Sequence, residues 1–525
     1  MNFKKITIII ALVGFLVSCT KDLDRSPKYG LTTDGLYKNE AGYRSSLAKI
    51  YGGLALTGNV GPDGSGDLGG IDEGFSSYLR QYWNLQELST DEAVIAWNDQ
   101  TIKDFHSMSW TSSDAFNRAL YSRIFYQITL ANAFIREAAD DKVSGRGITG
   151  ADADKIKSYR TEARFLRALS YYHALDLFGN PTFVTEDDGI GAYLPKQIER
   201  SALFNYVETE AKAIETLLPD PRQNEYARAD KAAVWMLLAN LYLNAKQYIG
   251  TEKNTEAITY SLKVINAGYT IEPKYGDLFL ADNHRSKEII FPVAFDGIRT
   301  RTWGGTTYLV HGPLGGNMDF QNDFGVDAAW GGIRTTKAFV NKFSDITGNT
   351  DKRAMFHTSG QNLEINDIGE FKDGYAIRKW KNLTSTGVKG SNATWVDTDF
   401  PMFRLTEAYL IYAEAVLRGG TGGSTATALT YFNIVRQRAY NGSTSGNLTA
   451  ITLDNILDER AREFYWEGKR RTDLIRFDRF TTATYLWPWK GGVSGGRSVE
   501  SFRNIYPIPA PELNSNPNLK QNPGY

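Results

Sequence analysis

Three segments of this 525-residue chain place apolar and small residues at steps of three and four, the period of an α-helix with one buried face. In residues 228–245 these are Ala232, Trp235, Ala239 and Tyr242. Residues 403–417 and 160–178 repeat the spacing with Tyr409, Tyr412, Ala413 and Val416, and with Leu166, Leu169, Ser170 and His173. Because each such helix buries one stripe against a neighbour, the chain is expected to fold as packed helices.

The spacing of Trp235, Leu238, Ala239 and Tyr242 is similar to the first helix of a tetratricopeptide repeat. A helix at 254–266, and another carrying Ala428, Phe432 and Val435, would complete two helical hairpins. Further helices are predicted at 115–139, 203–217 and 453–480. Since the separations are irregular, the sequence predicts a mainly α, tetratricopeptide-like scaffold of divergent repeats, with Trp235 in a core position.

Residues 275–399 interrupt the helical pattern. Gly, Thr, Asn and Asp dominate there, and Trp303 and Trp330 each stand before a pair of glycines; residues 52–74 have a similar composition. A long irregular stretch inside a compact protein is usually functional. We therefore expect a helical scaffold over about 30–274 and 400–480 that carries a loop-rich insert over about 275–399.

The N-terminus has the features of a bacterial export signal. Lys4 and Lys5 precede an apolar run over 6–17 that is too short to span a bilayer. Leu16-Val17-Ser18-Cys19 resembles a lipobox, and Cys19 is the only cysteine, so it has no disulfide to form. The sequence predicts a signal peptide over 1–18 and lipidation of Cys19. The alternative is a signal cleaved elsewhere that ends near a cysteine by chance.

Charge and motif content exclude several functions. A net charge of −1 argues against a nucleic-acid binder. The five histidines are far apart and the chain has no phosphate loop, so no cofactor or catalytic metal is expected. Asp277, Asp282 and Asn283 are the candidate ligands for a calcium ion.

A charged stretch near the C-terminus resembles a catalytic acid pair at first sight. Glu459, Glu463 and Glu467 follow one another at steps of four, with several arginines around them. Since i, i+4 neighbours of opposite charge satisfy one another along a helix, a structural ion network is the favoured interpretation.

Six motifs, in this order, resemble the SusD/RagB family of nutrient-binding outer-membrane lipoproteins: Glu87–Glu92, Glu162–Ala168, Phe400–Leu410, Glu459–Glu463, Glu467–Leu474, and Tyr506–Pro509 with Gln521–Tyr525. The resemblance covers essentially all of 19–525. It implies a tetratricopeptide-like platform whose loops hold a glycan site. It also implies a lipid-anchored protein on the outer face of the outer membrane, working with a SusC-like TonB-dependent transporter. The acidic residues after Cys19 resemble an export signal to that face.

Residues 58–74, 289–292 and 304–310 look closest to the starch-binding founder of that family. The resemblance places the founder's three glucan-binding rings at Trp97, Trp303 and Trp330, with Trp303 in place of a Tyr. Arg80 and Asn98 match polar groups that would reach sugar hydroxyls. The implied ligand is starch or an α-glucan oligosaccharide, which stacks its C–H faces on the rings without being cleaved.

Three alternatives stay open on the residues alone. A glycoside hydrolase needs only two carboxylates at a set separation, which a sequence does not exclude. A peptide-binding helical scaffold would make the loop tryptophans incidental. Trp97 follows the apolar residues 93–96, so packing in the core competes with a ligand role.

Overall fold

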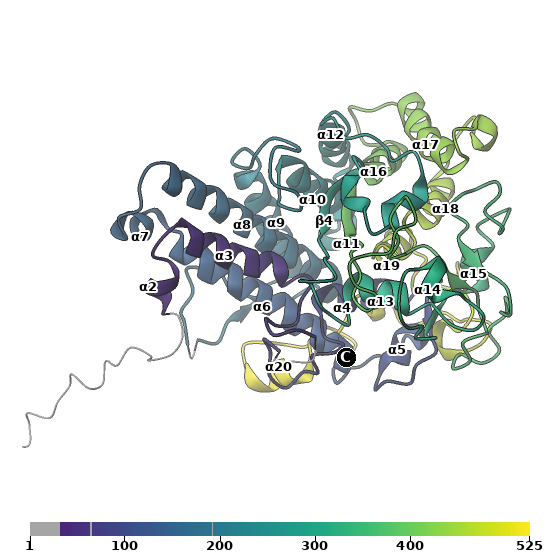
Figure 1. Ribbon diagram of the computed structural model, residues 1–525, viewed down its shortest axis with the longest axis horizontal. Helices are drawn as coiled ribbons and strands as arrows, with labels where there is room; N and C mark the ends of the chain where they lie inside the picture. The colour runs from purple at the N-terminus through teal and green to yellow at the C-terminus, as the bar shows by residue number, and fades with distance from the viewer. Residues whose placement is uncertain (1–31, 63–65, 192) are drawn as a thin grey trace, which may run out of the picture.

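The computed structural model describes residues 32–62, 66–191 and 193–525, and it confirms a mainly helical, repeat-like fold. Long helices from the N-terminal half of the chain lie on one side of the molecule, and the loop-rich middle of the chain lies on the other (Figure 1). The signal peptide and Cys19 lie outside the described residues. Among the residues described, no helix is both long and apolar enough to cross a membrane.

The N-terminal layer is built on the long helix α8 (Ala151–Phe178), which is almost entirely buried beyond residue 161. Around it pack α3 (Glu40–Gly52), α6 (Ala115–Glu137) and α9 (Arg200–Ile214). Asn39 and Asp114 begin α3 and α6 by accepting hydrogen bonds from backbone N–H groups of the first turn. The predicted helices at 115–139, 160–178 and 203–217 are confirmed.

Both predicted hairpins form. The helix α10 (Lys231–Leu243) packs on α12 (Asn254–Ile265), and α16 (Leu405–Leu417) packs on α17 (Thr425–Ala439). Helix α12 also packs on α16, so the two hairpins form one layer although about 140 residues separate them in the chain. The prediction for Trp235 is wrong in part: its ring is only half-buried, at the edge of this layer near Lys263.

The single helix predicted over 453–480 is wrong, because the chain turns sharply in the middle. It forms α18 (Leu453–Phe464) and α19 (Arg470–Arg476), separated by Trp466 and Gly468 with φ values of 62° and 73°. A Cβ on Gly468 would lie 2.7 Å from the Tyr82 ring, so this turn requires glycine. The turn packs α19 against α4 (Tyr78–Glu87).

Residues 275–399 contain only short elements, with helices of four to seven residues: α13 (Gly305–His311), α14 (Phe320–Asp323) and α15 (Lys337–Val340). Strand β4 (Ile289–Val293) pairs antiparallel with β8 (Phe400–Arg404), so this stretch leaves the helical layer and returns to it at one place. Two smaller antiparallel pairs lie within or beside it: β1 (Val94–Ile95) with β5 (Ile333–Arg334), and β6 (Phe356–His357) with β7 (Ala376–Ile377).

The remaining elements are short and connect or cap these layers: α2 (Thr33–Leu36), α5 (Ile102–Ser107), α7 (Asp140–Gly145), α11 (Ala245–Ile249), α20 (Ala510–Ser515), β2 (Thr182–Phe183), β3 (Lys196–Gln197), and the 3₁₀ turns η2 (Tyr275–Phe279), η3 (Asn283–Arg285), η4 (Thr444–Gly446), η5 (Lys490–Gly492) and η6 (Ser501–Asn504).

The predicted ion network is confirmed. Arg462 pairs with Glu459 at 2.7 Å within α18, but the other partners of these glutamates lie on other elements. Arg404 on β8 contacts Glu288, Glu463 and Glu467 at 2.8, 2.6 and 2.8 Å, and Arg353 contacts Glu459 and Glu463 at 2.8 and 3.1 Å. We call the following side chains the buried ion cluster: Glu288, Arg353, Lys379, Arg404, Arg438, Glu459, Glu463 and Glu467. All are buried, and they join α18 to the β4–β8 pair and to the loop-rich stretch.

Candidate functional site

The β1–β5 pair brings two of the predicted tryptophans together. Its antiparallel register places Ile95 opposite Ile333, and the Ala96 N–H donates to the Gly332 carbonyl at 2.8 Å. Trp97 follows the end of β1 and Trp330 precedes the start of β5, so the antiparallel pairing places the two residues side by side. The Trp97 Nε1–H donates to the Trp330 carbonyl at 3.0 Å, and the two ring centroids are 6.2 Å apart.

A glycine is required where these two loops meet. A Cβ on Gly332 would lie 2.4 Å from the Trp97 ring. The second glycine after Trp330, visible in the sequence only as a break in periodicity, therefore lets the indole of Trp97 lie against the backbone.

Trp303 and a fourth tryptophan extend the group. The centroid of the Trp303 ring lies 6.2 Å from that of Trp330, and the Trp395 ring lies 5.7 Å beyond Trp303. We call Trp97, Trp330, Trp303 and Trp395, in that spatial order, the tryptophan row. Successive rings are tilted by 47°, 58° and 47°, so the row does not form a flat surface, and all four side chains are half-buried.

Trp395 was not predicted. It follows the irregular stretch Gly390-Ser391-Asn392-Ala393-Thr394, so its sequence signal is the one that marks Trp303 and Trp330: a tryptophan in a loop with glycine and asparagine. Arg301 places its guanidinium 5.0 Å from the centroid of this ring and is exposed, so the row ends beside a cation.

Arg80, on α4, lies behind the row. Its guanidinium donates to the Trp303 carbonyl at 3.0 Å and lies 4.4 Å from the ring centroid of the buried Tyr308. The Tyr308 hydroxyl in turn donates to Asn84 at 2.9 Å. Burial lowers the pKa of Arg80, opposed by Tyr308, Asp99 and Asp72. These contacts fix the loop of Trp303 to the helical layer, whereas Asn98 is exposed directly beside Trp97.

His311 lies beneath the centre of the row. Its ring stacks on Trp330 with centroids 4.8 Å apart and planes 20° apart. Its Nδ1 lies 2.8 Å from the Ala328 carbonyl and its Nε2 lies 3.0 Å from the Thr394 carbonyl. Burial lowers the pKa of His311, while these carbonyls and Asp327 oppose that shift. This side chain bridges the loop of Trp330 and the loop of Trp395, and no sequence pattern indicated it.

Two of the three candidate calcium residues, Asn283 and Asp282, have other partners. The buried Asn283 side chain donates to the carbonyls of Leu278 and Asp399, both at 2.8 Å, and Asp282 accepts from the Ser385 N–H and hydroxyl at 2.8 and 2.7 Å. In the part of the chain that the structure describes, no three His, Cys, Asp or Glu side chains are grouped to hold a metal ion. The calcium hypothesis is therefore not supported.

The chemistry of the site is that of stacking and hydrogen bonding. Sugars present C–H groups on their faces, which pack on aromatic rings, and hydroxyls on their edges, which need donors and acceptors. The row supplies four mutually tilted rings, and the exposed Asn98, Asp99, Arg301 and Asp327 lie beside it.

Comparison with known proteins identifies the family of the chain. The sequence profile described as the SusD family matches residues 359–525. The starch-binding protein SusD of Bacteroides thetaiotaomicron is 37% identical over 99% of this chain and 98% of its own length. SusD-like protein P2 of Formosa agariphila is 24% identical over the full length of both.

The solved structures extend the likeness to the fold. Surface glycan-binding protein A from Bacteroides thetaiotaomicron, solved in complex with laminarihexaose, superimposes with a TM-score of 0.68 at 21% identity, over 91% of this chain and 98% of the other. The chain belongs to the SusD family, whose members are glycan-binding proteins without catalytic activity.

Proposed function

We propose that this protein captures starch or α-glucan oligosaccharides at the cell surface through the tryptophan row. The single observation that carries the proposal is the row itself: four half-buried indoles about 6 Å apart, with successive planes tilted. A helical α-glucan presents a curved series of sugar faces to such a surface, whereas a flat, extended glycan would contact fewer rings. The 37% identical relative is named for starch binding, which supports the same ligand.

We assign a role to each predicted residue in and beside the row. Trp97, Trp303 and Trp330 stack on sugar rings, and Trp395 adds a fourth platform. Asn98 is exposed at the edge and is placed to hydrogen-bond sugar hydroxyls. Arg80 positions the Trp303 loop through the Trp303 carbonyl.

A β-glucan is the second candidate ligand, because a structural relative was solved with laminarihexaose. Its 21% identity supports the fold and not the ligand, whereas the relative named for starch binding shares almost the full length of this chain. A comparison of the two glucans therefore decides the ligand.

The anchoring and partner are part of the proposal. Residues 1–18 are removed, Cys19 is acylated, and residues 19–525 face the cell exterior as a helical scaffold with its loop-rich insert. A SusC-like TonB-dependent transporter in the outer membrane receives the glycan. Cys19→Ala should move the protein out of the outer-membrane fraction, and protease added to intact cells should digest the wild type. Protection from protease until the cells are lysed would overturn the outer-face assignment.

The ligand is tested with the purified protein lacking its lipid. It should be retarded in native gels that contain amylopectin and should release no reducing sugar from it. Retardation by laminarin alone would replace α-glucan with β-glucan, and steady accumulation of oligosaccharide would contradict a binding-only function.

A further inference from the structure

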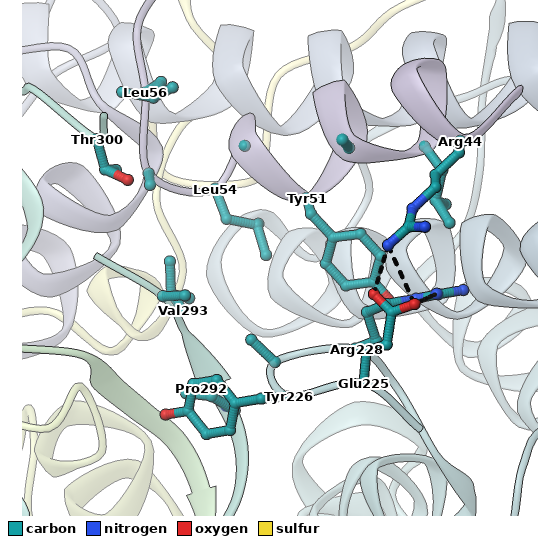
Figure 2. A pocket seen from close by; sticks show the side chains of 16 residues that line it. Arg44, Tyr51, Leu54, Leu56, Glu225, Tyr226, Arg228, Pro292, Val293 and Thr300 are labelled. Atoms are coloured by element: carbon teal, nitrogen blue, oxygen red, sulfur yellow. Dashed lines mark hydrogen bonds and ion pairs between the residues drawn. The ribbon is translucent and has the colours of Figure 1, made fainter. Parts of the chain in front are cut away.

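A cavity separate from the tryptophan row lies between α3, β4 and the loop that precedes α10. Its volume is about 330 Å³, within the range of small-molecule pockets. In Figure 2, Arg44 and Glu225 face each other on one side of it, and Pro292 and Tyr226 lie together on another. Leu54 and Val293 supply apolar surface between them.

Tyr226 has the properties of a binding platform and not of a core residue. Half of its surface is exposed, and its hydroxyl donates to the buried Asp399 carboxylate at 2.5 Å, which fixes the ring. Asp399 also accepts from the Phe295 N–H at 2.7 Å, so the hydroxyl end of the Tyr226 side chain is linked through Asp399 to the loop-rich stretch.

The loop that carries Tyr226 is held in an uncommon conformation. Arg222 and Ala227 have φ values of 64° and 63°, in the left-handed region that residues other than glycine rarely adopt. Such conformations persist where the surroundings hold them, and they concentrate at ligand sites. Tyr226 also lines a neighbouring cavity of about 310 Å³, so open volume adjoins its ring in two directions.

The lining selects an uncharged ligand with both polar and apolar faces. Arg44 and Glu225 pair at 2.9 Å with side chains 57% and 56% exposed. An ion pair this exposed contributes little to stability, so its donors and acceptors can bind hydroxyl groups instead. The pair carries no net charge. Arg228, which also lines the cavity, contacts Glu225 at 3.3 Å and has its charge balanced by the buried Glu162. Apart from Thr300, the rest of the lining is apolar or aromatic. A pyranose ring has this combination: a C–H face and a rim of hydroxyls.

The cavity is joined to the row by one continuous segment. Pro292, Val293 and Thr300 line the cavity, and Trp303 follows three residues later. The Gly297 N–H donates to Asp397 at 2.7 Å, which ties this segment to the loop of Trp395. We propose that the cavity at Tyr226 is a second saccharide subsite that binds one or two glucose units. This inference rests on the proposed function.

The test counts sites with maltohexaose by isothermal titration calorimetry. The wild type should bind two molecules, the stronger at the row. Tyr226→Ala should bind one, with the weaker site lost or weakened at least fivefold. Because Tyr226→Ala leaves Asp399 without a hydroxyl donor and can unfold the loop, Arg44→Ala combined with Glu225→Ala provides the second variant and should give the same loss.

Matched controls make the result specific. Lys155→Ala removes another exposed ion pair, with Asp152, whose side chains are 54% and 55% exposed, and should leave both sites unchanged. Trp303→Ala with Trp330→Ala should abolish the stronger site and leave the weaker one. Unchanged stoichiometry and affinity in both cavity variants would overturn the second subsite alone. A wild type that binds no maltohexaose would overturn it together with the proposed function.

Discussion

The buried ion cluster and the tryptophan row show opposite uses of residue type. In the cluster, strongly polar side chains such as Arg353, Arg404 and Glu463 are at most 1% exposed, and they bind one another across elements distant in sequence. In the row, four large apolar rings remain half-exposed. Charge in this protein therefore holds the loop-rich stretch to the helices, and aromatic surface is what remains available to a ligand. Burial, and not residue type, separates structure from function here.

Arg404→Ala is expected to have the largest effect, since Arg404 pairs with three carboxylates of the cluster. It leaves Glu288, Glu463 and Glu467 buried without their common cation. Removing one partner from a buried charge group costs about 3–5 kcal/mol, so the free energy of unfolding should fall by that amount. Denaturant unfolding measures it.

Arg299→Ala is the control for that experiment. Arg299 pairs with Asp296 at 2.8 Å, but its side chain is 83% exposed. Water solvates both charges after the change, so the denaturant midpoint should not move. Equal destabilisation by the two substitutions would contradict the distinction between buried and exposed charge.

A carboxyl pair next to the cluster predicts how stability depends on pH. Burial raises the pKa of Glu87 to about 8, and burial together with Glu87 raises that of Glu92. The folded protein thus retains a proton that the unfolded chain releases above pH ~4.5. The stabilising contribution is present below that pH and is lost as the pH rises through about 8.

Unfolding in urea between pH 5 and 9 measures this contribution. The free energy of unfolding of the wild type should fall as the pH rises, and Glu87→Gln should flatten the decline. The glutamine still offers an oxygen to the Gly468 N–H, which donates to Glu87 at 2.6 Å. Parallel pH curves for the two proteins would show that Glu87 does not hold the proton.

The helices were largely predictable from sequence, because periodic apolar residues mark α10, α12, α16 and α17. The extent of burial was not: α12 and α17 bury one face, whereas α10 and α16 are buried on nearly all sides. The break between α18 and α19 was not predictable, because residues distant in sequence hold Trp466 in its left-handed conformation. The Trp83 Nε1–H donates to the Trp466 carbonyl, and the Trp466 Nε1–H donates to the Glu92 carbonyl. The Glu459–Glu463–Glu467 spacing predicted an ion network, but Arg353 and Arg404 lie too far away in sequence to be identified as partners.

The candidate site was predictable to a similar degree. Family resemblance led to Trp97, Trp303 and Trp330, and the structure brings these three rings together. Trp395 joins them because His311 and Asp397 hold its loop in place, and neither contact has a local sequence signature. The closeness of Trp97 and Trp330 likewise depends on a two-residue strand pair, too short to be predicted from periodicity.

The row itself is tested by removing its rings. Trp303→Ala, Trp330→Ala and Trp395→Ala should each weaken glycan binding by about 1–3 kcal/mol, by analogy with stacking of bases on aromatic rings. Their melting temperatures should change little, since half-exposed rings leave small cavities. Trp97→Ala should weaken binding too, and it also removes the bond to the Trp330 carbonyl. Affinity electrophoresis and calorimetry measure these changes.

Trp466→Ala is the matched control for the row. Trp466 is fully buried, so its loss should cost about 3–5 kcal/mol of stability and affect binding only through unfolding. It serves better than Trp235, whose ring is half-buried. Wild-type affinity in both Trp303→Ala and Trp330→Ala would place the glycan site elsewhere and remove the support for α-glucan.

His311→Phe should have the smallest effect and gives the finest test, because it keeps an aromatic ring against Trp330 and removes only the polar bridge. Losing contacts to the Ala328 and Thr394 carbonyls should cost about 0.5–1.5 kcal/mol of glycan binding, since the loops of Trp330 and Trp395 are then less firmly held. His357→Phe, which removes a single contact to Asn317 away from the row, should bind like the wild type. Calorimetry should show the loss of affinity for a long oligosaccharide that contacts all four rings, and much less of it for a disaccharide. An equal loss of affinity for the long oligosaccharide and the disaccharide would mean that His311 affects only the Trp330 ring and does not align the row.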